Sequence, residues 1–194
     1  MMSATVKTTG PEKKPNDRSL PLMTEEQVVL VTPLDEELGV MEKMEAHRQG
    51  RLHRAFSIFL FDTHGKMLLQ RRSEQKYHFP GLWTNACCSH PKPGEALLAG
   101  AARRLTEELG ISVPLQLRGN VIYRFYDPVS GLTEHELDYV LTGCTDGPLH
   151  PDPLQISELR WLSLEELKQE IECYPGRFTP WFRHIMKVFP VWNG

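Results

Sequence analysis

Runs of apolar and β-branched residues predict eight short strands along the chain. Residues 54–62 (RAFSIFLFD) give the strongest signal, and residues 66–72 follow them after a Thr-His-Gly turn that is typical of a hairpin. Residues 27–32 predict an earlier strand, with residues 38–45 as its partner across a turn that contains Pro and Asp. Further strands are expected at residues 82–88, 117–126, 132–143 and 158–162.

Three helices are predicted among and after these strands. Residues 95–109 (EALLAGAARRLTEEL) begin with an acid and end just before Gly110. Ser163 and Glu166 have the spacing of a capping box for a helix over residues 164–174, and Thr179-Pro180 opens a last helix that runs to about residue 189. This order of elements predicts an α/β (α+β) fold, in which a mixed sheet has helices on its faces.

Length and composition fit one compact domain behind a tail. The chain has 194 residues, 40% of them hydrophobic and 24% charged, which suits one core and not two packed domains. Residues 1–24 are polar and rich in Lys, Pro and Thr. We therefore expect a flexible tail over residues 1–24 and a folded domain over residues 25–194.

Charge and cysteine usage narrow the class of protein. A net charge of −3 argues against nucleic-acid binding, and no apolar run approaches the ~20 residues of a membrane span. The N-terminus lacks the apolar core of a secretory signal. The four cysteines include the neighbours Cys87 and Cys88 and do not suggest a disulfide framework. We expect a cytoplasmic protein with a thiol available for chemistry.

Residues 89–111 (SHPKPGEALLAGAARRLTEELGI) resemble the Nudix box, G-x5-E-x7-R-E-U-x-E-E-x-G-U, where U is a bulky aliphatic residue. A helix of this kind presents carboxylates from successive turns to Mg²⁺ that carries a diphosphate. Two positions depart from the box, because Ser89 replaces the leading glycine and Arg104 replaces the first glutamate of the R-E-U-x-E-E run. The positions in register are Glu95, Arg103, Leu105, Glu107, Glu108, Gly110 and Ile111.

The arginine at position 104 changes the expected chemistry. Loss of a carboxylate removes a metal ligand, whereas a guanidinium supplies a clamp for a diphosphate. The site should therefore hold a diphosphate while lacking part of the machinery that hydrolyses one. The alternative for this segment is a surface helix with ordinary Arg/Glu pairs.

Further motifs make the resemblance more specific. They are Lys43-Met-Glu-Ala-His47, Leu52-His53-Arg54-Ala-Phe-Ser, Gln70-Arg-Arg-Ser, Phe79-Pro-Gly-Leu-Trp-Thr-Asn-Ala-Cys-Cys-Ser-His-Pro91, Glu134-His-Glu136-Leu-Asp-Tyr and Phe178-Thr-Pro-Trp181-Phe. With them, the chain from about residue 25 to 190 resembles the type I isopentenyl-diphosphate isomerases. The resemblance implies a Nudix-like fold and the interconversion of isopentenyl and dimethylallyl diphosphate in isoprenoid biosynthesis. The type II enzymes use flavin and have a different fold, so no flavin is expected.

The resemblance implies a first metal site of three histidines and two glutamates. Mixed imidazole and carboxylate donors suit Mn²⁺, Zn²⁺ or Mg²⁺, and the sequence does not choose among them. On a strand, Glu134 and Glu136 point to the same face, so His135 is expected to point away and to be structural. The implied ligands are His47, His53, His90, Glu134 and Glu136.

The resemblance also implies a Mg²⁺ ion on the diphosphate of a small-molecule substrate. Its expected protein ligands are Glu108 and the main-chain carbonyl of Cys88, since Mg²⁺ is usually bound by few carboxylates together with phosphate oxygens. Lys76 is expected to bind the diphosphate, and the alternative for this residue is a solvated lysine in a loop. The groups expected around the diphosphate are Lys43, Arg72, Lys76, Arg104 and the backbone N–H of Ser89.

The implied reaction needs an acid and a base that flank an alkene. It adds a proton to the terminal carbon and removes one from the far side of the resulting tertiary cation. The resemblance assigns these steps to Cys88 and Glu136, with Tyr123 hydrogen-bonding near the glutamate. Cys87 is expected to project to the opposite face of its strand and to pack in the core.

Aromatic residues are the expected means of stabilising the cation. Trp181 is the candidate for this role, because an indole face attracts a desolvated cation. Trp83 is expected as a second aromatic residue beside the site. The alternative for Trp181 is a plain core residue.

Two other functions fit parts of the sequence. A Nudix hydrolase of nucleoside diphosphate derivatives would share the helix over residues 95–109, but Arg104 and the T-N-x-x-C-x-H-P run oppose it, and phosphate release would reveal it. A non-catalytic diphosphate-binding module would bind substrate without turnover.

We expect a monomer or weak dimer.

Overall fold

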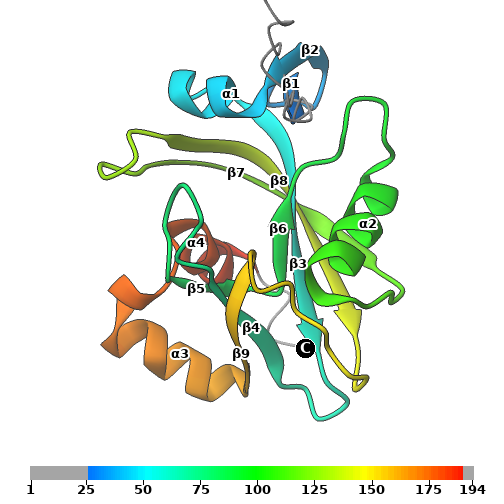
Figure 1. The fold of residues 1–194 in the computed structure, drawn as a ribbon, viewed down its shortest axis with the longest axis vertical. Helices are drawn as coiled ribbons and strands as arrows, with labels where there is room; N and C mark the ends of the chain where they lie inside the picture. The colour runs from blue at the N-terminus through cyan, green and yellow to red at the C-terminus, as the bar shows by residue number, and fades with distance from the viewer. Residues whose placement is uncertain (1–25, 190–194) are drawn as a thin grey trace, which may run out of the picture.

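A computed structural model describes residues 26–189. In this part of the chain, nine strands form one mixed sheet, with four α-helices around it (Figure 1). The architecture confirms the predicted α/β (α+β) fold. The predicted tail at residues 1–24 lies outside the described residues, as do both ends of the predicted domain at residues 25–194.

Two strands with a parallel register form the centre of the sheet. β3 (His53–Phe61) pairs with β8 (Thr133–Cys144), and β8 pairs antiparallel with β7 (Gln116–Tyr126). β1 (Gln27–Val31) and β2 (Glu37–Glu42) form an antiparallel pair beside the start of β3. β4 (Met67–Arg72) follows β3 in the predicted hairpin and pairs with β5 (Trp83–Asn85) and β9 (Ile156–Leu162).

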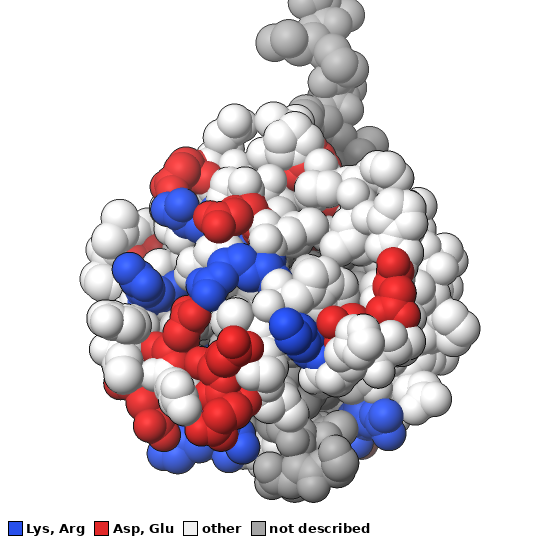
Figure 2. Space-filling model, turned by 90° about the horizontal axis from the view of Figure 1, so that it is seen from below, with Lys and Arg blue, Asp and Glu red and all other residues white. Residues whose placement is uncertain are grey.

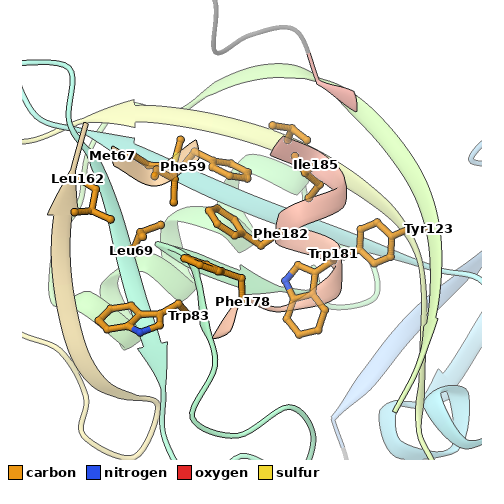
Figure 3. Close-up of a cluster of buried hydrophobic side chains, with 12 residues drawn as sticks. Phe59, Met67, Leu69, Trp83, Tyr123, Leu162, Phe178, Trp181, Phe182 and Ile185 are labelled. Atoms are coloured by element: carbon orange, nitrogen blue, oxygen red, sulfur yellow. The ribbon is translucent and has the colours of Figure 1, made fainter. Parts of the chain in front are cut away.

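Helices cover both faces of this sheet. Successive side chains of β3 point to opposite faces and therefore pack in two different cores. Phe56, Ile58 and Leu60 pack in the core that contains residues of α2 (Leu97–Leu109). Phe59 belongs to the other core, where it stacks on Phe182 of α4 (Pro180–Val188), as Figure 3 shows. The site described below lies on this second face.

The predicted strand over residues 38–45 is wrong at its end. β2 stops at Glu42, and Lys43–Gln49 form helix α1. The Glu42 carboxylate accepts the backbone N–H groups of Met44 and Glu45, each at 2.8 Å, and caps the helix. Gly50 ends it in the left-handed conformation at φ 61°.

The predicted strand over residues 82–88 is two strands. β5 pairs with β4, whereas β6 (Cys87–Ser89) pairs with β3, so the chain changes partner at Ala86. At the C-terminal side, α3 (Leu164–Cys173) begins with the predicted capping box, and a 3₁₀ turn at Pro175–Arg177, which was not predicted, leads to α4.

Positive and negative side chains are interspersed on the face of the molecule that Figure 2 shows. Lys and Arg side chains lie among Asp and Glu side chains on the face seen from below. None of the described helices is long and apolar enough to cross a membrane.

Candidate active site

A cavity of about 310 Å³ gathers most of the residues predicted for the site. Three others, His53, Tyr123 and Glu108, are buried behind its wall and contact residues that line it. The predicted residues that line the cavity are Lys43, His47, Arg72, Lys76, Cys88, Ser89, His90, Arg104, Glu134, Glu136 and Trp181.

Strand register brings the histidines and glutamates together. His53 of β3 lies opposite Glu136 of β8 in the parallel pair, and Tyr123 of β7 lies opposite the same glutamate from the other side. Lys43 and His47 are four residues apart on α1 and therefore share one helix face. Two pairs of consecutive elements, α1 with β3 and β7 with β8, thus meet at one point although the pairs are distant in sequence.

Four of the five predicted metal ligands form one group, in which the ligand atoms of His47, His53, His90 and Glu136 all lie within 4.8 Å of one another. The Nδ1 atoms of His47 and His53 lie 2.7 and 2.8 Å from backbone carbonyls, so the Nε2 lone pairs face the site. Nε2 of His90 lies 3.2 Å from Nε2 of His53 and 2.9 Å from the Glu136 carboxylate.

The fifth predicted ligand, Glu134, lies beside this group. Its Oε1 is 3.4 Å from Nε2 of His47, yet that buried nitrogen has no hydrogen-bond partner among the described residues. An unpaired imidazole nitrogen beside a carboxylate is what a cation would satisfy. The His/Glu group is therefore compatible with a divalent metal ion.

The protonation states of Glu136 and His90 favour a cation as well. Although burial and the neighbouring Glu134 raise the pKa of Glu136, its contacts with His53 and His90 lower that pKa overall. Burial would lower the pKa of His47, but Glu134 raises it to about 9, so a metal ion must displace a proton from this imidazole. Burial lowers the pKa of His90 to about 4, which leaves its imidazole neutral. Ionised carboxylates and a neutral imidazole are metal donors at neutral pH.

The thiol of Cys88 is held by a short network. It donates to Oδ1 of Asn85 at 3.0 Å and lies 3.6 Å from the Ser57 hydroxyl. Asn85 is fixed in turn, because its amide donates to the carbonyls of Ile58 and Cys87. Burial, together with the nearby Asp138 carboxyl, raises the pKa of Cys88 to about 12, so the sulfur carries a proton.

Cys87 lies on the other face of β6, as predicted, and is fully buried in the core beside α2. His135 likewise points away from Glu134 and Glu136, and its Nδ1 hydrogen-bonds the Gly50 carbonyl at 2.9 Å.

A chain of buried hydrogen bonds runs behind the cavity. The Tyr123 hydroxyl donates to Glu136 at 2.5 Å and lies 3.2 Å from Asp138, which also accepts the Ser57 hydroxyl at 2.7 Å. Since Ser57 contacts Cys88, this chain connects the predicted thiol to the predicted carboxylate. Asp138 and Ser57 were not predicted as site residues, although both belong to the motifs around Glu136 and His53.

The basic residues form the other side of the cavity. Lys43 pairs with Glu26, and Lys76 contacts Gln155 and lines the cavity instead of standing free in solvent. Arg104 pairs with Glu107 at 2.6 Å and with Glu108, which is 2% exposed. Glu108 is thus shared between the guanidinium and any cation that binds there.

The two predicted tryptophans occupy different places. Trp181 is 3% exposed, lines the cavity and has the Arg72 guanidinium carbon 5.4 Å from its ring centroid. Trp83 does not line the cavity, so its predicted place beside the site is wrong. It packs in the same core, with Phe178 between the two indoles in the view of Figure 3 and Arg160 over its ring at 5.1 Å.

Comparison with known proteins places the chain in a family. Residues 51–182 match the NUDIX domain family model. An isopentenyl-diphosphate Delta-isomerase of Nocardia farcinica is 44% identical over 162 residues, which cover 83% of this chain and 93% of the relative. Its counterpart in Pectobacterium atrosepticum is 45% identical over 164 residues, which cover 84% of this chain and 91% of the relative.

Solved structures agree at the level of the fold. A Deinococcus radiodurans protein superposes with a TM-score of 0.68 at 22% identity, over 84% of this chain and 99% of that one. The MutT protein of Methanosarcina mazei superposes with a TM-score of 0.60 at 22% identity, over 73% of this chain and 95% of that one. The fold and the sequence relatives together show that the chain belongs to the NUDIX domain family and, within it, to the isopentenyl-diphosphate Delta-isomerases.

Proposed function

We propose that this protein interconverts isopentenyl diphosphate and dimethylallyl diphosphate, the reaction implied by the names of its relatives. One observation carries the proposal. The Cys88 thiol, the Glu136 carboxylate and the Trp181 indole line a single cavity, together with four basic side chains. A proton donor, a proton acceptor and a cation stabiliser are the groups that a double-bond shift requires.

The basic side of the cavity is proposed to bind the diphosphate. Arg72, Arg104 and Lys76 offer charge-assisted hydrogen bonds to phosphate oxygens, and Lys43 does so once it leaves Glu26. The Ser89 backbone N–H is the proposed fifth donor. Because the diphosphate is chemically unchanged in this reaction, these contacts serve binding and orientation.

Cys88 and Glu136 are proposed to carry the two protons of the reaction. In the forward direction, one proton bonds to the terminal methylene carbon as the alkene π electrons open to a tertiary cation. A proton then leaves the methylene carbon on the diphosphate side of the cationic carbon, and the electrons of that C–H bond form the new double bond. One group loses a proton and the other gains one, so a single proton transfer between them restores the starting state.

Two aromatic residues are proposed to support these steps. The Tyr123 hydroxyl, 2.5 Å from Glu136, fixes the orientation of the carboxylate. The Trp181 ring stabilises the tertiary cation by about 2 kcal/mol when water is excluded, which is roughly thirtyfold in rate.

Metal ions are proposed at both predicted positions. Mn²⁺, Zn²⁺ or Mg²⁺ would be held by the three histidines with Glu134 and Glu136, where a bound cation supplies electron withdrawal that tunes the acidity of the Glu136 carboxyl. A Mg²⁺ ion on the diphosphate would use Glu108 and the Cys88 carbonyl. We further propose a monomer or weak dimer in the cytoplasm, where the four free cysteines stay reduced.

The test is a turnover assay of the purified protein with isopentenyl diphosphate, Mg²⁺ and Mn²⁺. We expect dimethylallyl diphosphate to form without release of phosphate. Phosphate that appears in step with substrate loss would instead identify a hydrolase, and binding without either product would identify a binding module.

A further inference from the structure

His78 is a buried histidine at the cavity that neither the sequence motifs nor the proposed chemistry uses. It lies in the loop between β4 and β5 and is 6% exposed. Its Nε2 contacts Oε1 of Glu134, and its ring centroid lies 5.9 Å from that of His47 and 6.0 Å from that of Trp181. The side chain therefore stands between the His/Glu group and the indole.

The backbone around His78 is tied to the basic side of the cavity. The Arg72 guanidinium donates to the carbonyls of His78 at 2.9 Å and of Phe79 at 3.1 Å. Phe79 has φ 44°, a left-handed conformation that costs energy for a residue with a Cβ atom. Its ring packs edge-on against Trp181 at 5.3 Å. Contacts on both sides thus hold the loop in one unfavourable conformation.

Glu134 needs support from outside the metal site. A carboxylate that ligates a metal is commonly held by an outer hydrogen-bond donor, whose loss weakens metal affinity about 10–100-fold. His78 is in the place of such a donor, since its Nε2 meets the same Oε1 that lies 3.4 Å from His47.

We propose that His78 is a positioning residue, whose side chain holds Glu134 for the metal ion and whose main chain holds Arg72 for the diphosphate. The inference rests on the proposed function, because it takes the His/Glu group as a metal site. The role of the His78 side chain can be tested separately from the role of its main chain. Side-chain substitution should disturb the metal and remove the 3.5 Å contact between Arg72 and Nε2 of His78, but it should leave the two shorter Arg72 contacts, which use carbonyl groups.

The experiment compares three variants. His78→Phe keeps an aromatic ring but has no N–H donor, and His78→Leu is a second donor-free variant of smaller size. His78→Gln restores a donor near the position of Nε2 without the ring. His64→Phe is the matched control, since His64 is an exposed histidine in the β3–β4 turn.

Calorimetric titration of metal-free protein with Mn²⁺ is the main measurement, and circular dichroism checks the fold. We expect His78→Phe and His78→Leu to bind about 10–100-fold more weakly than wild type, with His78→Gln within about tenfold and His64→Phe unchanged. At saturating Mn²⁺, the KM for isopentenyl diphosphate should change less than about threefold in His78→Phe, because the two shorter Arg72 contacts are made by the main chain.

Wild-type affinity in either folded donor-free variant would overturn the proposal. A complete loss of one metal equivalent that His78→Gln does not restore would overturn it too, since His78 would then be a direct ligand. The titration needs no turnover, so its result stands apart from whether the protein proves to be an isomerase.

Discussion

Cys87 and Cys88 show how the pleat of a strand gives two identical neighbours different environments. Cys88 lies in the cavity beside Asn85, and Cys87 packs beside α2. Cys88→Ala should lower turnover by roughly 10²–10⁴-fold, the usual contribution of a positioned proton carrier, with little change in melting temperature. Cys87→Ala should keep its turnover and lose about 1 kcal/mol of stability. Steady-state kinetics and thermal melting of both variants test this, and equal losses of activity would contradict it.

Arg104 and Arg103 are also neighbours with different surroundings. Arg104 lines the cavity, whereas Arg103 forms a two-point pair with Glu95 at 2.8 and 2.9 Å outside it. Arg104→Ala removes a charge-assisted contact of about 1.5–3 kcal/mol to the diphosphate, so KM should rise roughly 10–100-fold with a smaller change in kcat. The control Arg103→Ala should lower stability without this rise in KM. An unchanged KM in Arg104→Ala would make Arg104 an ordinary helix-surface residue.

At this scale the sequence predicted most of the residues that meet in the cavity, because motif spacing marks them. His78, Asp138 and Ser57 were missed. Their importance comes from contacts across the sheet, as when Ser57 of β3 bonds Asp138 of β8, and such contacts leave no local pattern. Trp83 was misplaced because proximity in sequence to the Cys88 motif does not decide which way its indole points.

At the scale of elements, α1 is the part that strand periodicity could not predict. Seven residues, Lys43–Gln49, form a helix that supplies both Lys43 and His47 to the cavity. The apolar pattern of β2 continues by chance into the residues that follow it, so the pattern does not show where the strand ends. The hydrogen bonds of the Glu42 cap and the left-handed conformation of Gly50 define the helix. The split between β5 and β6 was missed for a similar reason, since a change of pairing partner is a tertiary event.

Gly50 offers a test of what this helix contributes. A Cβ at Gly50 would meet the Arg124 guanidinium at 3.0 Å and Thr133 at 3.4 Å, whereas Gly65, with φ 77°, has nothing within 4 Å. Gly50→Ala and Gly65→Ala should each lose about 1–2 kcal/mol of stability from the left-handed backbone. Only Gly50→Ala should also weaken Mn²⁺ binding, since Gly50 caps the helix that carries His47, whereas Gly65 lies in the turn between β3 and β4. Equal Mn²⁺ affinities in the two variants, measured by titration, would contradict this role of α1.

At the scale of the whole molecule, His47 links stability to pH. Its pKa is about 9 in the folded protein without metal, against ~6.5 for an ordinary histidine. A raised pKa stabilises the fold fully below the unfolded value and loses that contribution as pH rises through about 9. A bound metal ion removes this dependence above the unfolded value, because it holds the imidazole in its neutral form and has already displaced the proton.

The expected result is a pH dependence of stability in the metal-free protein that bound Mn²⁺ abolishes. As pH rises from about 6.5 to 9, the His47 contribution should lower the melting temperature of metal-free protein and leave that of Mn²⁺-loaded protein unchanged. His47→Gln cannot titrate, so the difference between wild type and this variant isolates the effect. An equal dependence of melting temperature on pH in metal-free and Mn²⁺-loaded wild-type protein would show that His47 does not exchange a proton for the metal.

The central claim is that this protein moves a double bond by adding one solvent-derived proton and removing another. NMR of the reaction with isopentenyl diphosphate in deuterated water tests it most directly. The account predicts dimethylallyl diphosphate with deuterium in the methyl group formed from the terminal methylene, no released phosphate, and product that forms roughly 10²–10⁴-fold more slowly with Cys88→Ala. Release of phosphate with the alkene unlabelled and in its original position would contradict it.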